Sequence, residues 1–481
     1  MNIPSRQWRL AVATAAGLSI AAHAADPIKI GISIAQSPPG SVVQGTQVKD
    51  GLEIMKDEVN KAGGALGRSI ELVYEDNQGV PEKGRAATEK LITRDKVVAV
   101  TGGHQSSVCL AEIEVAKRYN VPYVNTNCWS DDVRKKEYPQ VFNPGNYNSR
   151  VGLAMAETIA AMRVKRVIAL VENTDYGIGQ AKAVAEALKQ KAPSVEYKYE
   201  TLDRAGKDFT PAVLPLRANP PEMILTMLLP PAAYIVMNQL YEQGVAPSAK
   251  TWLYDGAGIA DYPDFWQNVK EAGKYMLEFG LYHPQMKTPK LGLEVAKTYQ
   301  QRTKNEPNRL IFQAADSLLL IVDAIKQAKG TDPNAMIKAL ETMKFEGVRG
   351  EFRFSKESGY KFHQWVEIPY VNYTDEVVAF TNDPSLIHSF MTKFDDMWIS
   401  DSEFADYAKK NLVLVEVDFP RGKKQTEEQK KANQKLAEKY KIKGYPTIIV
   451  LNSEGTQVGE LSYMSNPKPF IEELDKLKKK S

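Results

Sequence analysis

The chain has 481 residues, of which 43% are hydrophobic and 25% are charged, an ordinary composition for a globular protein. A chain of this length favours about three compact units. The formal net charge of +3 is small, so neither a nucleic acid nor a membrane surface is implied as a partner.

The N-terminus has the pattern of a secretory signal peptide. Arg6 and Arg9 supply positive charge, residues 10–22 form a short apolar stretch, and residues 22–24 make a small-x-small cleavage site. The apolar stretch is too short for a stable membrane span, and no other segment approaches the ~20 apolar residues that a span requires. We therefore predict a signal peptide at residues 1–24 and an exported protein without direct membrane insertion.

From residue 28 onwards, apolar strand-like segments alternate with amphipathic helical segments. The first part reads as strand, helix, strand and helix at residues 28–35, 50–64, 69–76 and 81–96. The pattern restarts after residue 144, with helix, strand, helix and strand at residues 146–162, 166–173, 175–191 and 195–202. This alternation predicts an α/β fold of two doubly wound parallel-sheet lobes. A cleft between two such lobes is where we expect a small ligand.

Residues 97–130 contain a candidate anion site. A strand at residues 97–100 leads through a glycine pair to Ser106 and Ser107, which lie where the next helix should begin. The first amides of a helix lack intrahelical partners and carry partial positive charge, so a carboxylate could bind there. The two serines could equally do no more than cap the helix, and both interpretations stay open.

Only two cysteines occur in the chain. Cys109 lies in the first turn of this predicted helix, and Cys128 follows the next predicted strand, which could bring them close together. An oxidising compartment permits a disulfide, but pairing depends on geometry that a sequence does not contain. A disulfide and two buried free thiols therefore both stay open.

Segments spread over the chain match one family in its own order. They read GISIAQSPPG (31–40), LITRDKVVAVTGGHQSS (91–107), YNVPYVNTN (119–127), VENTDYGIGQ (171–180) and AADSLLLIVDAI (314–325). As an ordered set, they make the chain from about residue 28 to 388 resemble the substrate-binding proteins of branched-chain amino acid ABC transporters. These are the Leu/Ile/Val-binding group of type I periplasmic binding proteins.

The resemblance implies a two-lobed, hinged, monomeric protein in the periplasm that is not an enzyme and needs no cofactor. Its ligand would be an amino acid or a similar small polar metabolite, and its partners would be the permease and ATPase subunits of an ABC importer. The alternative function is a periplasmic ligand-sensing receptor module without transport. The receptor would occupy residues 25–390, with lobe 1 at about 27–146 and 276–346 and lobe 2 at about 147–275 and 347–388.

The family pattern also implies the ligand contacts on lobe 1. The α-carboxylate of the ligand would lie at Ser106 and Ser107, with help from the loop that carries Asn127 and Trp129. Trp129 is large where relatives often have a small residue, and Gln44 lies in a loop that lacks the family's pocket aromatic. The ligand could therefore also be an aromatic acid, an amide or another small polar metabolite.

Lobe 2 would close the site through two further residues. By the same resemblance, Tyr176 covers the ligand and Asp255 pairs with its α-ammonium. Anchors on opposite lobes would make closure depend on the ligand. The alternatives are a surface loop tyrosine and a turn or helix-cap aspartate, both common roles for these residue types.

Enzyme motifs are missing from the sequence. The segment TGGHQSS is not a dinucleotide fingerprint and lacks the Lys-Ser/Thr pair of a phosphate loop. His104 is next to Ser106 and Ser107, but residues two or three apart on one turn rarely adopt triad geometry, and no G-x-S-x-G motif occurs. The histidines show no metal-ligand spacing. We therefore expect neither catalysis nor a bound metal.

The last segment, residues 391–481, has a different composition, rich in lysine and glutamate. It resembles the C-terminal part of a thioredoxin-like domain, in which Pro446 matches the cis-proline. The segment contains no cysteine and so lacks the C-x-x-C redox motif, which excludes a disulfide oxidoreductase. We expect a truncated thioredoxin-like module, either a binding appendage or the product of a gene fusion.

Overall fold

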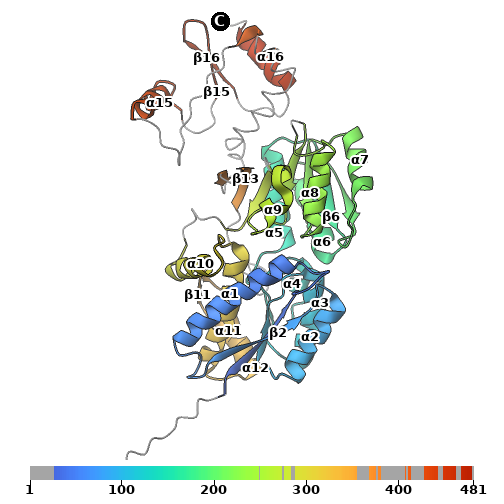
Figure 1. The fold of residues 1–481 in the computed structure, drawn as a ribbon, viewed down its shortest axis with the longest axis vertical. Helices are drawn as coiled ribbons and strands as arrows, with labels where there is room; N and C mark the ends of the chain where they lie inside the picture. Colours follow the sequence, from blue (N-terminus) through green and yellow to red (C-terminus); the bar gives the residue numbers. More distant parts are fainter. Residues whose placement is uncertain are drawn as a thin grey trace, which may run out of the picture.

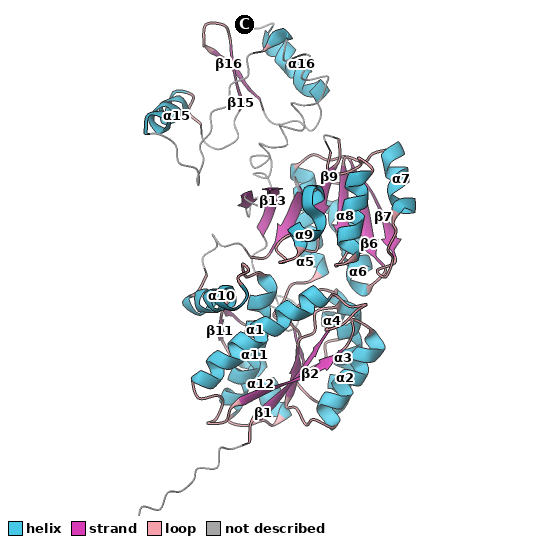
Figure 2. Cartoon of the chain, viewed as in Figure 1, coloured by secondary structure: helices cyan, strands magenta, loops and turns pink. Residues whose placement is uncertain are grey.

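The computed structural model describes residues 26–248, 250–273, 276–282, 288–354, 368–374, 377–380, 407, 410–412, 427–442, 448–461 and 467–478. The predicted signal peptide and Pro446 lie outside these residues. Two α/β lobes follow one another along the long axis of the molecule (Figures 1 and 2). Within the described part of the chain, none of the helices has the length and apolar character needed to cross a membrane.

Lobe 1 contains a five-stranded parallel sheet of order β2-β1-β3-β4-β5. Its strands are β1 (Ile28–Ile34), β2 (Ile70–Asp76), β3 (Ala99–Thr101), β4 (Tyr123–Val124) and β5 (Val141–Phe142). Its helices are α1 (Val42–Lys61), α2 (Pro81–Thr93), α3 (Ser106–Tyr119), α4 (Asp131–Lys135), α10 (Lys290–Thr303), α11 (Arg309–Ala328) and α12 (Pro333–Thr342). Helix α1 packs against α11, and α2 packs against α3.

Lobe 2 contains a seven-stranded sheet of order β14-β13-β10-β9-β8-β6-β7. The strands are β6 (Arg166–Glu172), β7 (Glu196–Leu202), β8 (Met223–Met227), β9 (Trp252–Asp255), β10 (Met276–Gly280), β13 (Ile368–Thr374) and β14 (Val377–Phe380). All neighbours are parallel except β10–β13 and β13–β14. The helices are α5 (Asn148–Ala161), α6 (Asp175–Lys191), α7 (Thr210–Ala218), α8 (Ala232–Glu242), α9 (Phe265–Val269) and the 3-10 helix η1 (Lys270–Gly273).

Continuous apolar strands explain the two sheets, because a parallel strand is covered on both faces. Strand β8 is buried at every position, and Ile28, Ile30, Ile32 and Ile34 of β1 are all buried. Gly51 lets α1 approach α11, since a Cβ atom there would lie 2.4 Å from the carbonyl oxygen of Ile311. The predicted fold class, two parallel-sheet α/β lobes, is confirmed.

The chain crosses between the lobes at positions that differ from two predicted boundaries. Residues 276–280 were expected in lobe 1, but β10 pairs with β9 and belongs to lobe 2. The hairpin of β11 (Phe345–Gly347) and β12 (Gly350–Phe352) stays with lobe 1, where the Val348 amide donates to Asp316 of α11 at 2.7 Å. The local pattern of a strand does not show which sheet it joins, so both boundaries needed the tertiary structure.

The C-terminal region is described in parts. Helix α15 (Glu427–Lys439) precedes an antiparallel pair, β15 (Ile448–Leu451) and β16 (Gln457–Leu461), and α16 (Pro467–Lys478) follows. Leu461, Phe470 and Leu474 form a small buried cluster that joins α16 to the hairpin. The thioredoxin-like interpretation of residues 391–481 stays a prediction.

Candidate ligand-binding site

A pocket lies between the two lobes, at the carboxyl ends of the parallel strands. Lobe 1 lines it with Gln44, His104, Gln105, Ser106, Ser107, Asn127, Trp129 and Arg309, and lobe 2 with Glu172, Thr174, Tyr176, Arg204, Leu229 and Ala257. Most of these residues belong to the loops that follow β3, β4, β6, β7, β8 and β9, and Gln44 lies in the first turn of α1. Open parallel sheets commonly bind ligands at this edge.

The start of α3 supplies the lobe 1 wall. The hydroxyl oxygen of Ser106 accepts a hydrogen bond from the Ser130 amide at 3.1 Å, and that of Ser107 accepts from the Asp175 amide of lobe 2 at 3.1 Å. The helix itself begins after Gln105. Both serine hydroxyls therefore bond to other segments of the chain, and the interpretation that they only cap α3 is wrong.

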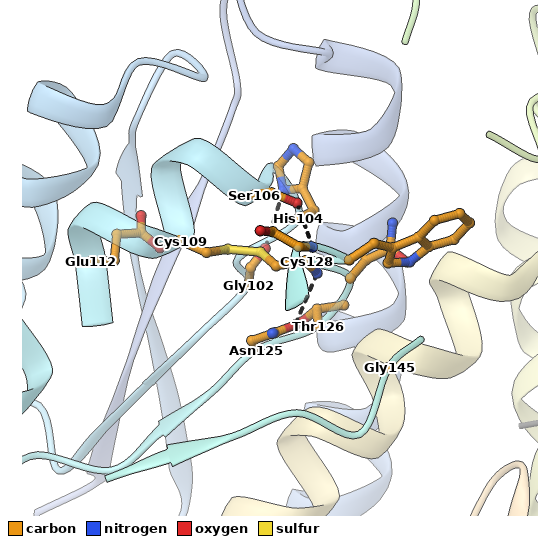
Figure 3. Close-up of a disulfide and its surroundings, with 12 residues drawn as sticks. Gly102, His104, Ser106, Cys109, Glu112, Asn125, Thr126, Cys128 and Gly145 are labelled. Atoms are coloured by element: carbon orange, nitrogen blue, oxygen red, sulfur yellow. Dashed lines mark hydrogen bonds between the residues drawn. A yellow bond between two sulfur atoms is a disulfide. The ribbon is translucent and has the colours of Figure 1, made fainter. Parts of the chain in front are cut away.

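A disulfide joins α3 to the neighbouring loop (Figure 3). It links Cys109 in the first turns of α3 to Cys128, and the Cα atoms of the two cysteines lie 6.5 Å apart. The same loop holds Trp129, whose indole N–H donates to the Asn127 side-chain oxygen at 2.8 Å. The bond thus holds the loop with Asn127 and Trp129 against the helix with Ser106.

Tyr176 brings lobe 2 onto lobe 1. Its ring meets that of Trp129 edge-on, with centroids 5.9 Å apart, and its hydroxyl donates to the Gly256 carbonyl at 3.3 Å. The side chain is buried, and burial, with the nearby Asp255 and Glu172 carboxylates, raises the pKa of its hydroxyl. Tyr176 therefore lies at the meeting of the lobes, not on the surface.

Asp255 does not line the pocket. It lies beneath the following loop, where its carboxylate accepts from the amides of Ala257 at 3.2 Å and Ile259 at 3.1 Å and from the Thr226 hydroxyl at 3.1 Å. Burial raises the pKa of its carboxyl group to about 6, although these hydrogen bonds oppose the rise. The residue of this loop that lines the pocket is Ala257. Asp255, the predicted partner of the ligand ammonium, is instead directed into lobe 2, where it holds the loop in shape.

Glu172 is the acidic side chain in the pocket lining. Its carboxylate accepts from the Thr174 hydroxyl at 2.6 Å and from the Leu229 amide at 3.0 Å. Burial raises its pKa, opposed by the Thr174 hydrogen bond and the charge of Arg204. The sequence analysis missed it because it ends an otherwise apolar strand. A charged residue at the carboxyl end of such a strand was the available signal.

Two arginines also line the pocket, and both reach across the gap between the lobes. Arg204 of lobe 2 donates to the Gly79 carbonyl of lobe 1 at 3.0 Å. Arg309 of lobe 1 donates to the Ala257 carbonyl at 2.6 Å and to the Tyr262 hydroxyl at 3.0 Å, and also bonds to Gly258. With two arginines and one glutamate in its lining, together with the start of α3, the pocket favours a negatively charged ligand.

The fold and this site define a two-lobed α/β protein with a pocket for a small molecule between its lobes. The family model "Periplasmic binding protein" matches residues 27–366, and the chain belongs to that family. Members of the family bind solutes and are not enzymes, and the family implies a periplasmic location. Within the described residues, no group of at least three His, Cys, Asp or Glu side chains could hold a metal ion.

Named relatives agree with the predicted resemblance to the Leu/Ile/Val-binding group. An amino acid binding protein of Pseudomonas aeruginosa is 24% identical over 371 residues, which are 75% of this chain and 95% of the relative. A Leu/Ile/Val-binding protein homolog 7 of Brucella melitensis is 24% identical over 380 residues, covering 74% of this chain and 90% of the relative.

Solved structures share the fold. The leucine binding protein LivK of Thermotoga maritima superposes with a TM-score of 0.66 at 20% identity, covering 74% of this chain and 97% of that one. LivJ of Streptococcus pneumoniae in complex with isoleucine gives 0.65 at 22% identity, with 74% and 99% covered. A Rhodopseudomonas palustris solute binding protein in complex with benzoate gives 0.63 at 19% identity, with 74% and 95% covered.

Proposed function

We propose that this protein is the solute-binding component of an ABC importer and that its ligand is a small carboxylate, either an amino acid or an aromatic acid. The observation that carries the proposal is the pocket itself, in which the start of α3 and two arginines surround a space between the lobes. The ligand carboxylate would lie at Ser106 and Ser107, beside Asn127 and Trp129.

Two ligand chemistries fit this arrangement. An amino acid would place its ammonium at Glu172, in the role that the sequence analysis gave to Asp255. An aromatic acid would place its ring against Trp129 and Tyr176 and needs no acidic partner. Both types occur among the similar proteins, as an amino acid binding protein and as a structural neighbour in complex with benzoate.

Closure would couple binding to transport. Contacts between the lobes, such as Ser107 to Asp175 and Arg204 to Gly79, belong to the closed arrangement. A ligand that contacts both lobes binds the closed form more tightly than the open form, and this difference in affinity shifts the protein towards the closed form. The closed form would then be recognised by permease and ATPase partners, with the receptor acting as a monomer. The transporter names of the relatives favour this function over a sensor without transport.

The test is a thermal-shift and calorimetric screen of the exported protein against amino acids and benzoates. A ligand at 100 times its Kd should add about 3 kcal/mol to the unfolding free energy. Glu172→Gln should abolish binding of an amino acid but spare that of a benzoate, while the exposed control Glu186→Gln should change neither. If no carboxylate binds, or if the Kd of a carboxylate that binds is unaffected by Arg204→Ala, the proposal is wrong.

We further propose that residues 1–24 are removed on export and that residues 391–481 are an appended module with a role separate from the pocket. Mass spectrometry of the periplasmic protein checks the first point. Ligand affinity measured with and without residues 391–481 checks the second.

A further inference from the structure

One side chain in the pocket has hydrogen-bonding capacity that the fold leaves unused. His104 lies between β3 and α3, and only 4% of its surface is exposed. One ring nitrogen, Nδ1, lies 3.1 Å from the carbonyl oxygen of Gly102. The other, Nε2, is buried and has no hydrogen-bond partner among the described residues.

The bond to Gly102 determines what Nε2 can do. A carbonyl oxygen only accepts, so Nδ1 carries the proton and donates it. Burial, aided by the positive charge of Arg204, lowers the pKa of the ring to about 4, so it is neutral at pH 7. A neutral ring with its proton on Nδ1 has a lone pair on Nε2, which makes this nitrogen an acceptor.

The position of His104 relates this acceptor to the carboxylate site. Figure 3 shows the ring beside Ser106, with Gly102 beneath it and the disulfide on the side of α3. His104 and Ser106 lie two residues apart in the chain and both line the pocket. A group that meets Nε2 would therefore lie near the carboxylate end of the ligand.

A second acceptor in the same lobe strengthens the pattern. Gln44 is buried, its side-chain nitrogen donates to the Tyr262 hydroxyl at 2.8 Å, and its side-chain oxygen has no partner among the described residues. Buried polar atoms of folded proteins are nearly always paired. His104 and Gln44 both line the pocket, and each has a buried acceptor with no partner in the described part of the chain, which points to a bound molecule that brings hydrogen-bond donors.

We propose that His104 determines the ligand class by accepting a hydrogen bond from it, and that the ligand is a small acid with a hydroxyl or amino group next to its carboxylate. This inference rests on the proposed function and narrows it. A bare acid of the same shape would leave Nε2 buried without a partner, and sites built to pair a polar group reject analogues that lack it.

The first test uses two sets of three acids that share a carbon skeleton and are titrated by calorimetry. One set is leucine, leucic acid and isocaproate, and the other is phenylglycine, mandelate and phenylacetate. In a set that binds, the hydroxy or amino acid should bind at least about 10-fold more tightly than the bare acid. His104→Phe should reduce this ratio to below about 3-fold, because it keeps a ring and removes the acceptor.

Two results would overturn the inference and leave the proposed function standing. One is that the native protein binds the bare acid as tightly as the hydroxy or amino acid of the same set. The other is that the ratio of these affinities is unchanged in His104→Phe. Absence of binding by all six acids would overturn the inference, and failure of the amino acids and benzoates of the wider screen as well would overturn the carboxylate site itself. A second measurement needs no variant. In ring-nitrogen NMR spectra of the native protein, the Nε2 signal of His104 should move towards the protonated position when the preferred acid is added. An unmoved signal in the saturated complex would refute the assignment.

Discussion

Glu112 on α3 should make the stability of this protein depend on pH in an unusual direction. Its carboxyl group is completely buried and accepts from the hydroxyls of Ser33 and Tyr123, both at 2.5 Å, and from the Asn77 side chain at 3.4 Å. Burial raises its pKa from 4.5 to about 7, although the three hydrogen bonds oppose the rise. The native state therefore retains a proton that the unfolded chain loses.

The sign and size of the effect follow from this difference. Since the folded pKa is the higher one, the stabilising contribution is fully present below pH 4.5 and is lost as pH rises through about 7. One pKa unit is worth about 1.4 kcal/mol, so the loss amounts to about 3 kcal/mol. Glu112→Gln removes the titrating group and keeps a neutral side chain of similar shape.

Urea unfolding at a series of pH values measures this contribution. The free energy of unfolding of Glu112→Gln minus that of the native sequence should rise by about 3 kcal/mol between pH 4.5 and pH 8. The control Glu186→Gln, at an exposed position, should give a flat difference. Parallel curves for the native protein and Glu112→Gln would show that Glu112 is ionised in the folded state and would refute the reasoning.

Three other substitutions have definite expected outcomes. Replacing Cys109 and Cys128 by serine should cost about 3 kcal/mol of stability, because the disulfide closes a loop with a sequence separation of 19; identical urea midpoints would contradict this. Arg309→Lys should weaken ligand binding in calorimetry by about 10-fold, since an ammonium cannot replace the planar fork of donors that spans the lobes. An unchanged Kd would count against this role in closure. Asp255→Asn should lower the unfolding free energy by about 1–3 kcal/mol, because one of the two accepting oxygens becomes an NH₂ group that cannot accept from the loop amides or the Thr226 hydroxyl. A melting temperature equal to that of the native protein would exclude this.

Much of the pocket could be predicted because its residues adjoin recognisable local patterns. Ser106 and Ser107 follow a strand and a glycine pair, whereas Asn127, Trp129 and Tyr176 were predicted from the resemblance to the family. Glu172 ends an apolar strand, which was the one local signal available for it, whereas nothing local separates Arg204 from an ordinary charged loop residue. Arg309 was harder still, because it starts a helix that is remote in sequence from every other residue of the pocket lining.

The sequence by itself determined the alternation of strands and helices and the division into two α/β lobes, because apolar periodicity acts over a few residues and repeats along the chain. The resemblance to the family came from the ordered set of matching segments. Only the tertiary structure decided that β10 joins lobe 2, that Asp255 is directed beneath its loop and that His104 has a buried ring nitrogen without a partner among the described residues. These outcomes depend on hydrogen bonds and packing between segments that are distant in sequence, and a local pattern carries no information about them.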